Sequence, residues 1–123
     1  MKIGFIGLGN VGGKLASSLL RNKFDVTVRD LDSRLVEQFK KLGAKSAGTP
    51  KELAKKVELI ITCLPSPEIC SKVMEGSNGV IEGLSENKIW LEMSTTDEHE
   101  VKRIGEKIKK LKAVPLDLSL IHI

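Results

Sequence analysis

Three glycines near the start of the chain, Gly7, Gly9 and Gly12, have the spacing G-x-G-x-x-G within the stretch GFIGLGNVGG. They follow directly on a predicted strand and directly precede a predicted helix, which is the context that a dinucleotide-binding turn requires. Gly7 would permit a tight turn, Gly9 would let the backbone approach a pyrophosphate, and Gly12 would let helix and strand pack closely. The free N–H groups at the helix N-terminus would then face the anion.

A dinucleotide-binding site also needs an acidic residue at the end of the second strand, and this chain has one there. Asp30 follows Gly12 by 18 residues and comes directly after the β-rich stretch DVTVR. Its carboxylate would accept hydrogen bonds from the hydroxyls of the adenosine ribose. The alternative is that Asp30 only caps the loop before Ser33. A carboxylate at this position repels a 2′-phosphate, so the motif favours NAD over NADP.

Short apolar segments alternate with amphipathic ones along the whole chain, and this pattern predicts the elements that would position these residues. Helices are expected after the glycine turn, from Ser33, from Pro50, from Pro67 and after Thr95-Thr96-Asp97. The alternation predicts an α/β fold, namely a Rossmann-type doubly wound parallel sheet of about six strands with helices on both faces. The strands are expected at 2–6, 25–29, 44–46, 58–63, 89–92 and 113–116.

The apolar residues of three predicted helices form the stripes that should face the sheet. The first helix carries the apolar residues Val11, Leu15, Ala16, Leu19 and Leu20. We expect the inward-facing residues to be Leu35, Val36, Phe39 and Leu42 in the second helix, and Val101, Ile104, Ile108 and Leu111 in the last.

Length and composition are ordinary for one globular domain. The 123 residues are 41% hydrophobic and 29% charged, and the net charge of +4 fits a soluble surface. Aromatic residues make up 3% of the chain, which leaves little stacking surface for nucleic acid. Cys63 and Cys70 form no metal-ligand pattern, so we expect reduced thiols and no metal site. With no signal-peptide layout and no run of about 20 apolar residues, we expect a cytoplasmic chain without a membrane partner.

Five motifs in order, GFIGLGNVG, DVTVRDLD, ITCLPSP, EGSNGVIEG and LEMSTTD, resemble those of the 3-hydroxyisobutyrate dehydrogenase family of β-hydroxyacid dehydrogenases. The pattern also resembles, more loosely, 6-phosphogluconate dehydrogenase. The resemblance covers residues 2–117, which match the dinucleotide-binding domain of the family. It implies a parent enzyme that transfers a hydride between a small 3-hydroxy acid and NAD, and that assembles as a homo-oligomer.

The resemblance also implies roles for particular residues. Asp30-Leu31-Asp32 stand where members that prefer NADP often have Asn-Arg-Thr, which supports NAD. Thr95 would serve both as a helix cap and as a ligand contact. No lysine of this chain matches the family's general acid/base, so no catalytic residue is assigned. The implied cofactor contacts are Gly7, Leu8, Gly9, Asn10, Val11, Gly12, Asp30, Leu64, Pro65 and Thr95, and the implied substrate contacts are Ser94 and Thr95.

The family pattern is lost after Asp117, where L-D-A-P-V-S-G-G should stand and the chain instead reads LSLIHI. We interpret 118–123 as a tail foreign to the family, with a strand extension as the alternative. One hypothesis is a read-through artefact, because codons for these six residues can match a transposon end used in sequencing libraries. The helical catalytic domain of the family is then expected to be absent, and the chain to bind NAD weakly without turnover. The alternatives are a free-standing nucleotide-binding or regulatory module and a lysine-rich nucleic-acid binder.

Overall fold

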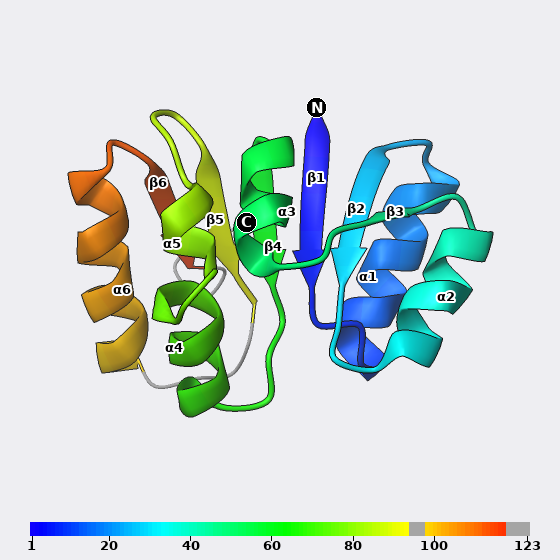
Figure 1. The fold of residues 1–123 in the computed structure, drawn as a ribbon, viewed down its shortest axis with the longest axis horizontal. Helices are drawn as coiled ribbons and strands as arrows, with labels where there is room; N and C mark the ends of the chain where they lie inside the picture. The colour runs from blue at the N-terminus through cyan, green and yellow to red at the C-terminus, as the bar shows by residue number, and fades with distance from the viewer. Residues whose placement is uncertain (94–97, 118–123) are drawn as a thin grey trace.

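A computed structural model describes residues 1–93 and 98–117 of the chain. Its core is one sheet of six parallel strands in the order β3-β2-β1-β4-β5-β6 (Figure 1). This order confirms the predicted doubly wound sheet, and each strand lies within one residue of its predicted bounds. The strands are β1 (Lys2–Ile6), β2 (Asp25–Arg29), β3 (Lys45–Ser46), β4 (Leu59–Thr62), β5 (Ile89–Glu92) and β6 (Val114–Asp117).

Within residues 1–93 and 98–117, six helices connect the strands, and three of these begin at a described side-chain cap. The side chain of Asp32 accepts a hydrogen bond from the N–H group of Arg34, that of Thr49 accepts from Glu52, and that of Ser66 accepts from Ile69. The starts predicted at Pro50 and Pro67 are confirmed, and the predicted cap at Thr95-Thr96-Asp97 lies outside the described residues. The four-residue α5 was not predicted, because one turn gives no periodic signal. The helices are α1 (Asn10–Arg21), α2 (Ser33–Lys41), α3 (Pro50–Lys56), α4 (Pro67–Glu75), α5 (Val80–Gly83) and α6 (Glu98–Lys110).

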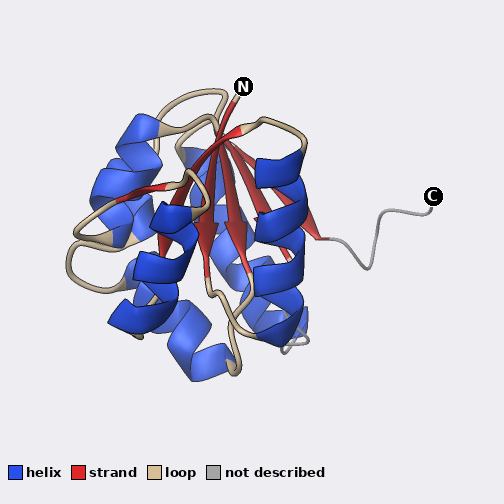
Figure 2. Ribbon diagram, turned by 90° about the vertical axis from the view of Figure 1, so that its right-hand side faces the viewer, coloured by secondary structure: helices blue, strands red, loops and turns tan. Residues whose placement is uncertain are grey.

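Helices cover both faces of the sheet, and each face has its own apolar core (Figure 2). On one face, α1 and α2 bury Ala16 and Phe39 against β1 and β2. On the other face, α3 to α6 pack around Trp90, which is completely buried. No helix within the described ranges is long and apolar enough to cross a membrane.

Two residues predicted to face the sheet are exposed instead, and those predictions were wrong. Leu42 and Leu111 have relative exposures of 60% and 39%. They come directly after the last residues of α2 and α6, where the helical periodicity no longer holds. In α1, Gly12 and Ala16 are buried, whereas the neighbouring Val11 is 61% exposed.

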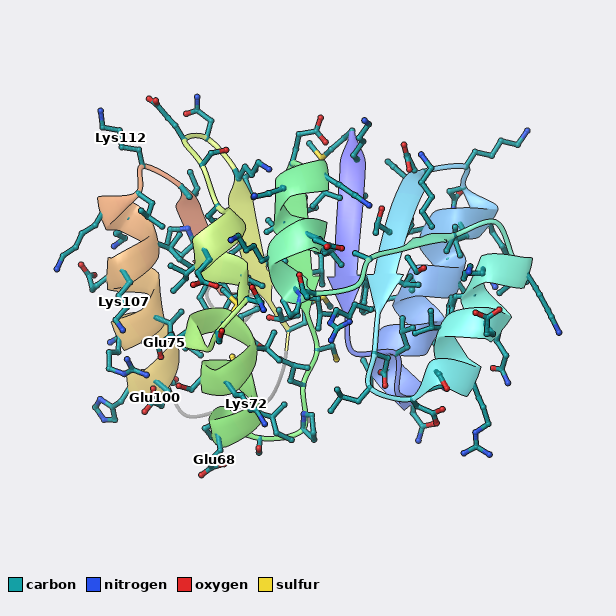
Figure 3. All side chains as sticks on the ribbon, in the orientation of Figure 1. Glu68, Lys72, Glu75, Glu100, Lys107 and Lys112 are labelled. Atoms are coloured by element: carbon teal, nitrogen blue, oxygen red, sulfur yellow. The ribbon has the colours of Figure 1, made fainter. Side chains whose placement is uncertain are left out.

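A charged cluster joins α4 to α6 (Figure 3). Glu75 of α4 accepts from Arg103 at 2.5 and 2.8 Å and also pairs with Lys107. Ser71 donates to the same carboxylate at 3.0 Å. The hydrogen bonds from Arg103 are the main cause that lowers the pKa of Glu75 from 4.5 to about 2. The folded state therefore favours the ionised carboxylate.

Glu75→Gln should lower the free energy of unfolding by about 1 kcal/mol at neutral pH, because hydrogen bonds between charged groups are lost. The pKa of Glu75 is depressed on folding, so its contribution is present above the unfolded value near 4.5 and disappears as the pH falls toward 2. Urea unfolding of both chains across this range checks the expectation. Glu106→Gln, which removes an exposed pair with Lys109 at 3.4 Å, is the control and should change little. A Glu75→Gln deficit that stays constant down to pH 2 would rule out this origin.

Candidate dinucleotide site

The strand order reverses between β1 and β4, which lie side by side in the sheet. The helices that follow them, α1 and α4, pack on opposite faces. The carboxyl ends of the strands and the loops β1–α1 and β4–α4 lie together at the lower edge of Figure 1. In open α/β sheets, ligands bind in the crevice at such a switch point.

The glycine turn after β1 has the geometry that its spacing predicts. Gly7 has a φ of +99°, and a Cβ there would lie 2.1 Å from the carbonyl oxygen of Cys63. A Cβ on Gly12 would lie 2.1 Å from the carbonyl oxygen of Gly7. These contacts confirm that Gly7 forms the tight turn and that Gly12 lets α1 pack closely on it. Gly9 differs, because among the described residues nothing beyond its own chain neighbours lies within 4 Å of its Cβ position.

The N-terminus of α1 opens toward this space. Gly9 is its N-cap residue, and within the part of the chain that the structure describes no side chain caps the helix. The first turn carries no acidic residue, so nothing in it repels an anion. The exposed backbone at Gly9 and Asn10 therefore presents donors and a partial positive charge to a ligand.

Asp30 ties the glycine turn to the loop after β2. Its Oδ2 accepts from the backbone N–H of Leu8 at 2.7 Å, and its Oδ1 accepts from the N–H of Asp32 at 2.8 Å. Asp30 does cap the loop before Ser33 through its bond from Asp32, as the alternative interpretation has it, while the N-cap residue of α2 is Asp32 itself. Sequence reasoning missed the bond to Leu8, because it joins residues 22 apart. The expected contact with ribose remains a prediction.

The other predicted site residues are distributed around the same edge. Asn10, Val11 and Pro65 are exposed there, and Leu64 is half-buried. The side chain of Leu8 is buried in the core, so only its backbone borders the turn. Ser94 and Thr95 lie outside the described residues. Arg29 donates to the carbonyl oxygen of Gly48 at 2.6 Å, which directs its guanidinium to the β3–α3 loop.

A buried polar network that the sequence did not reveal lies at the carboxyl ends of β4 and β5. Trp90 Nε1 donates to Thr62 Oγ1 at 2.9 Å, and that hydroxyl donates to Glu92 Oε2 at 2.6 Å. Cys70 Sγ donates to the same oxygen at 3.3 Å. Burial and then the charge of Glu92 raise the pKa of the Cys70 thiol, so the thiol is neutral. The only sequence signal was a threonine and a glutamate at the ends of apolar strands.

Cys63 lies beside the glycine turn, at the end of β4. Burial, followed by the charge of Glu92, raises the pKa of its thiol, although a hydrogen bond from the backbone of Gly12 acts in the opposite direction. The thiol is therefore protonated at neutral pH. A protonated thiol is a poor nucleophile, which agrees with assigning Cys63 no catalytic role.

A doubly wound parallel sheet with this turn at its switch point defines an NAD(P)-binding domain of the Rossmann type. Comparison with known proteins narrows the class. Residues 2–120 match the model of the NAD binding domain of 6-phosphogluconate dehydrogenase, and the chain belongs to this family.

Named relatives agree with this assignment. The mitochondrial 3-hydroxyisobutyrate dehydrogenase of Mus musculus is 32% identical over 115 residues, which are 94% of this chain and 34% of that protein. The 3-sulfolactaldehyde reductase of Escherichia coli K12 is 41% identical over 93 residues, 76% of this chain and 31% of that protein. The chain thus spans about a third of the length of these curated relatives.

A solved structure supports the same fold. The 3-hydroxyisobutyrate dehydrogenase of Mycobacterium tuberculosis, determined with L-serine, superposes with a TM-score of 0.84 at 20% identity. The match covers 94% of this chain and 39% of that one.

Proposed function

We propose that this chain binds NAD across the carboxyl ends of β1, β2 and β4, as the cofactor domain of a 3-hydroxy acid dehydrogenase. The observation that carries the proposal is the open backbone at Gly9, next to the N-terminus of α1, which no described side chain caps. The pyrophosphate would lie over this turn and accept hydrogen bonds from the first N–H groups of the helix. Gly7, Leu8, Asn10, Val11 and Gly12 would border it.

The adenosine half would lie on the side of β2. Asp30 would face the ribose from its place between the turn and the β2–α2 loop. Leu31, which is 92% exposed, and Val11 would border the adenine at the surface. The nicotinamide half would then extend over β4 and β5, past Leu64 and Pro65 and toward Ser94 and Thr95. NAD supplies the hydride acceptor, and these residues would hold and orient it.

The preference for NAD over NADP would come from two carboxylates at the adenosine end. The pKa of Asp32 is lowered, first by the hydrogen bond from the backbone of Arg34, so it is ionised at neutral pH. A 2′-phosphate would bring its negative charge close to Asp30 and Asp32.

Asp32→Ser tests this origin of the preference. Serine keeps the N-cap hydrogen bond, because it is as good an N-cap residue as aspartate, and removes only the charge. We expect the ratio of the NADP and NAD dissociation constants to fall about threefold or more, with NAD affinity nearly unchanged. Glu37→Gln, on the exposed side of α2, is the matched control for charge. Calorimetric titration with each dinucleotide measures the two dissociation constants. An unchanged ratio in Asp32→Ser would show that the charge of Asp32 does not cause the preference for NAD.

We propose the dehydrogenase activity for the whole protein. The relatives are about three times as long as this chain. A small 3-hydroxy acid, related to 3-hydroxyisobutyrate, is the proposed substrate class, and Ser94 and Thr95 are the proposed contacts to it. The support is the order of motifs along the chain and the names of the relatives. A homo-oligomeric parent and a cytoplasmic location remain predictions.

A further inference from the structure

Four charged residues form a row on the flank of α6 that lies next to β6, at one end of the molecule (Figure 1). They are exposed, they stand three or four residues apart, and their charges alternate in sign along the helix. This charged row consists of Glu98, Lys102, Glu106 and Lys109. Another flank of α6 differs, because its Arg103 binds Glu75 of α4 within the chain. The charged row instead faces solvent at the end of the sheet.

An apolar groove runs beside the charged row. It has a volume of about 200 Å³, and apolar residues from β5, α6 and β6 line it together with the row: Trp90, Val101, Gly105, Pro115 and Leu116. Burying apolar surface on association is favourable, and protein interfaces combine an apolar centre with a polar rim. The groove and the charged row together have this composition.

The backbone of β6 does not favour the addition of a further strand. β6 is the last strand in the sheet order. The N–H of Val114 donates to the carbonyl oxygen of Lys88 at 2.8 Å, so the backbone groups of Val114 face β5 and those of Pro115 face outward. Proline has no N–H, and an added strand would therefore lose a hydrogen bond at this place. A partner on this side must be held by side chains.

The charged row is complementary to itself. In a two-fold symmetric interface, residue i of one copy contacts residue j of the other, and j contacts i. If two α6 helices lie antiparallel, Glu98 faces Lys109 of the other copy, and Lys102 faces Glu106. The midpoints of these two pairs fall within one residue of each other, so a single axis near residues 103 and 104 serves both. Every charge of the row then meets an opposite one, whereas parallel helices in register would bring like charges together.

We propose that the charged row and the groove bind a second copy of this chain, with the two α6 helices antiparallel across a two-fold axis. Charges of alternating sign at this spacing also support an isolated helix through pairs within it. The pair between Lys109 and Glu106 is of that kind, but at 3.4 Å and with side chains 62% and 70% exposed it contributes little to stability. Pairing within the helix also leaves the apolar groove open, whereas a second copy covers it.

Sedimentation velocity of the 123-residue chain over about 1 to 500 µM measures the association. Because the groove is small, we expect a weak dimer that dissociates at about 1 µM. Lys102→Glu alone and Glu106→Lys alone should each raise the dimer dissociation constant about tenfold or more, since the two-fold axis makes each like-charge contact occur twice. An equimolar mixture of the two variants should dimerise again, because each variant then meets opposite charges at both contacts.

Lys110→Glu is the matched control for charge. Lys110 is exposed on the same helix, but it lies about 100° around the helix axis from Lys109 and outside the charged row. This variant should dimerise like the unmodified chain. Circular dichroism shows whether each variant is folded.

The outcomes are independent of the proposed NAD site, because β6 lies at the end of the sheet and the switch point lies between β1 and β4. Restored dimers in the mixture support the proposal. A folded chain that stays monomeric at about 500 µM would overturn it and leave the groove to an occupant other than a second copy. Dimers that both charge variants form as readily as the unmodified chain, or a mixture that stays monomeric, would overturn it as well.

Discussion

Gly7→Ala is expected to lower the free energy of unfolding by about 3 kcal/mol or more, and to abolish NAD binding with it. The substitution has two separate costs. A φ of +99° strains any residue with a Cβ, and the Cβ itself would lie 2.1 Å from the carbonyl oxygen of Cys63. Since that oxygen belongs to the backbone at the end of β4, the turn and the neighbouring strand must move apart. Denaturant unfolding monitored by circular dichroism measures the loss.

Gly43→Ala is the matched control for this prediction. Gly43 has a φ of +107°, but apart from its chain neighbours no residue that the structure describes comes within 4 Å of its Cβ position. The substitution therefore adds the same backbone strain without the collision, and should cost about 1 kcal/mol. If Gly7→Ala lowered the free energy of unfolding no more than Gly43→Ala does, the predicted collision with the carbonyl oxygen of Cys63 would not cost stability, which would contradict this prediction.

Gly9→Ala is expected to have the opposite profile, with binding lost and the fold retained. The φ of −68° suits alanine, and in residues 1–93 and 98–117 nothing beyond the chain neighbours lies within 4 Å of the added Cβ. The unfolding free energy should change by less than about 1 kcal/mol, the cost of a poorer N-cap residue. The Cβ would, however, occupy the space through which the pyrophosphate approaches the backbone. The dissociation constant of NAD should rise about tenfold or more, and further in Gly9→Val.

Gly105→Ala controls for the effect of an added methyl group away from the site. Gly105 lies in α6, and its Cβ would make ordinary contacts with Pro115 at 3.5 and 3.6 Å. Its affinity for NAD should match that of the unmodified chain. Undiminished affinity in Gly9→Ala would show that the pyrophosphate does not lie on this turn, even if the chain binds NAD elsewhere.

The local sequence was sufficient to predict most of the fold. Short apolar segments located all six strands, and the caps at Thr49 and Ser66 placed the starts of two helices. These signals are local, because a strand pattern or a cap depends on neighbours a few residues away. The predictions failed at residues that lie just beyond the end of a helix. Leu42 and Leu111 continue an apolar stripe past the last helical residue and become exposed.

The candidate site was predicted only where residue type alone determines geometry. The spacing of Gly7, Gly9 and Gly12 requires a turn of this kind, and the structure contains it. The bond from Leu8 to Asp30 and the network around Glu92 depend on which strands become neighbours in the sheet. No short-range pattern carries that information, so both features emerged only from the three-dimensional arrangement.

Calorimetric titration of NAD⁺ into the unmodified 123-residue chain tests the central claim most directly. The account predicts saturable binding at one site, with NADP⁺ bound more weakly and the heat of binding lost in Gly9→Ala. The absence of saturable binding by a chain that circular dichroism shows to be folded would contradict it.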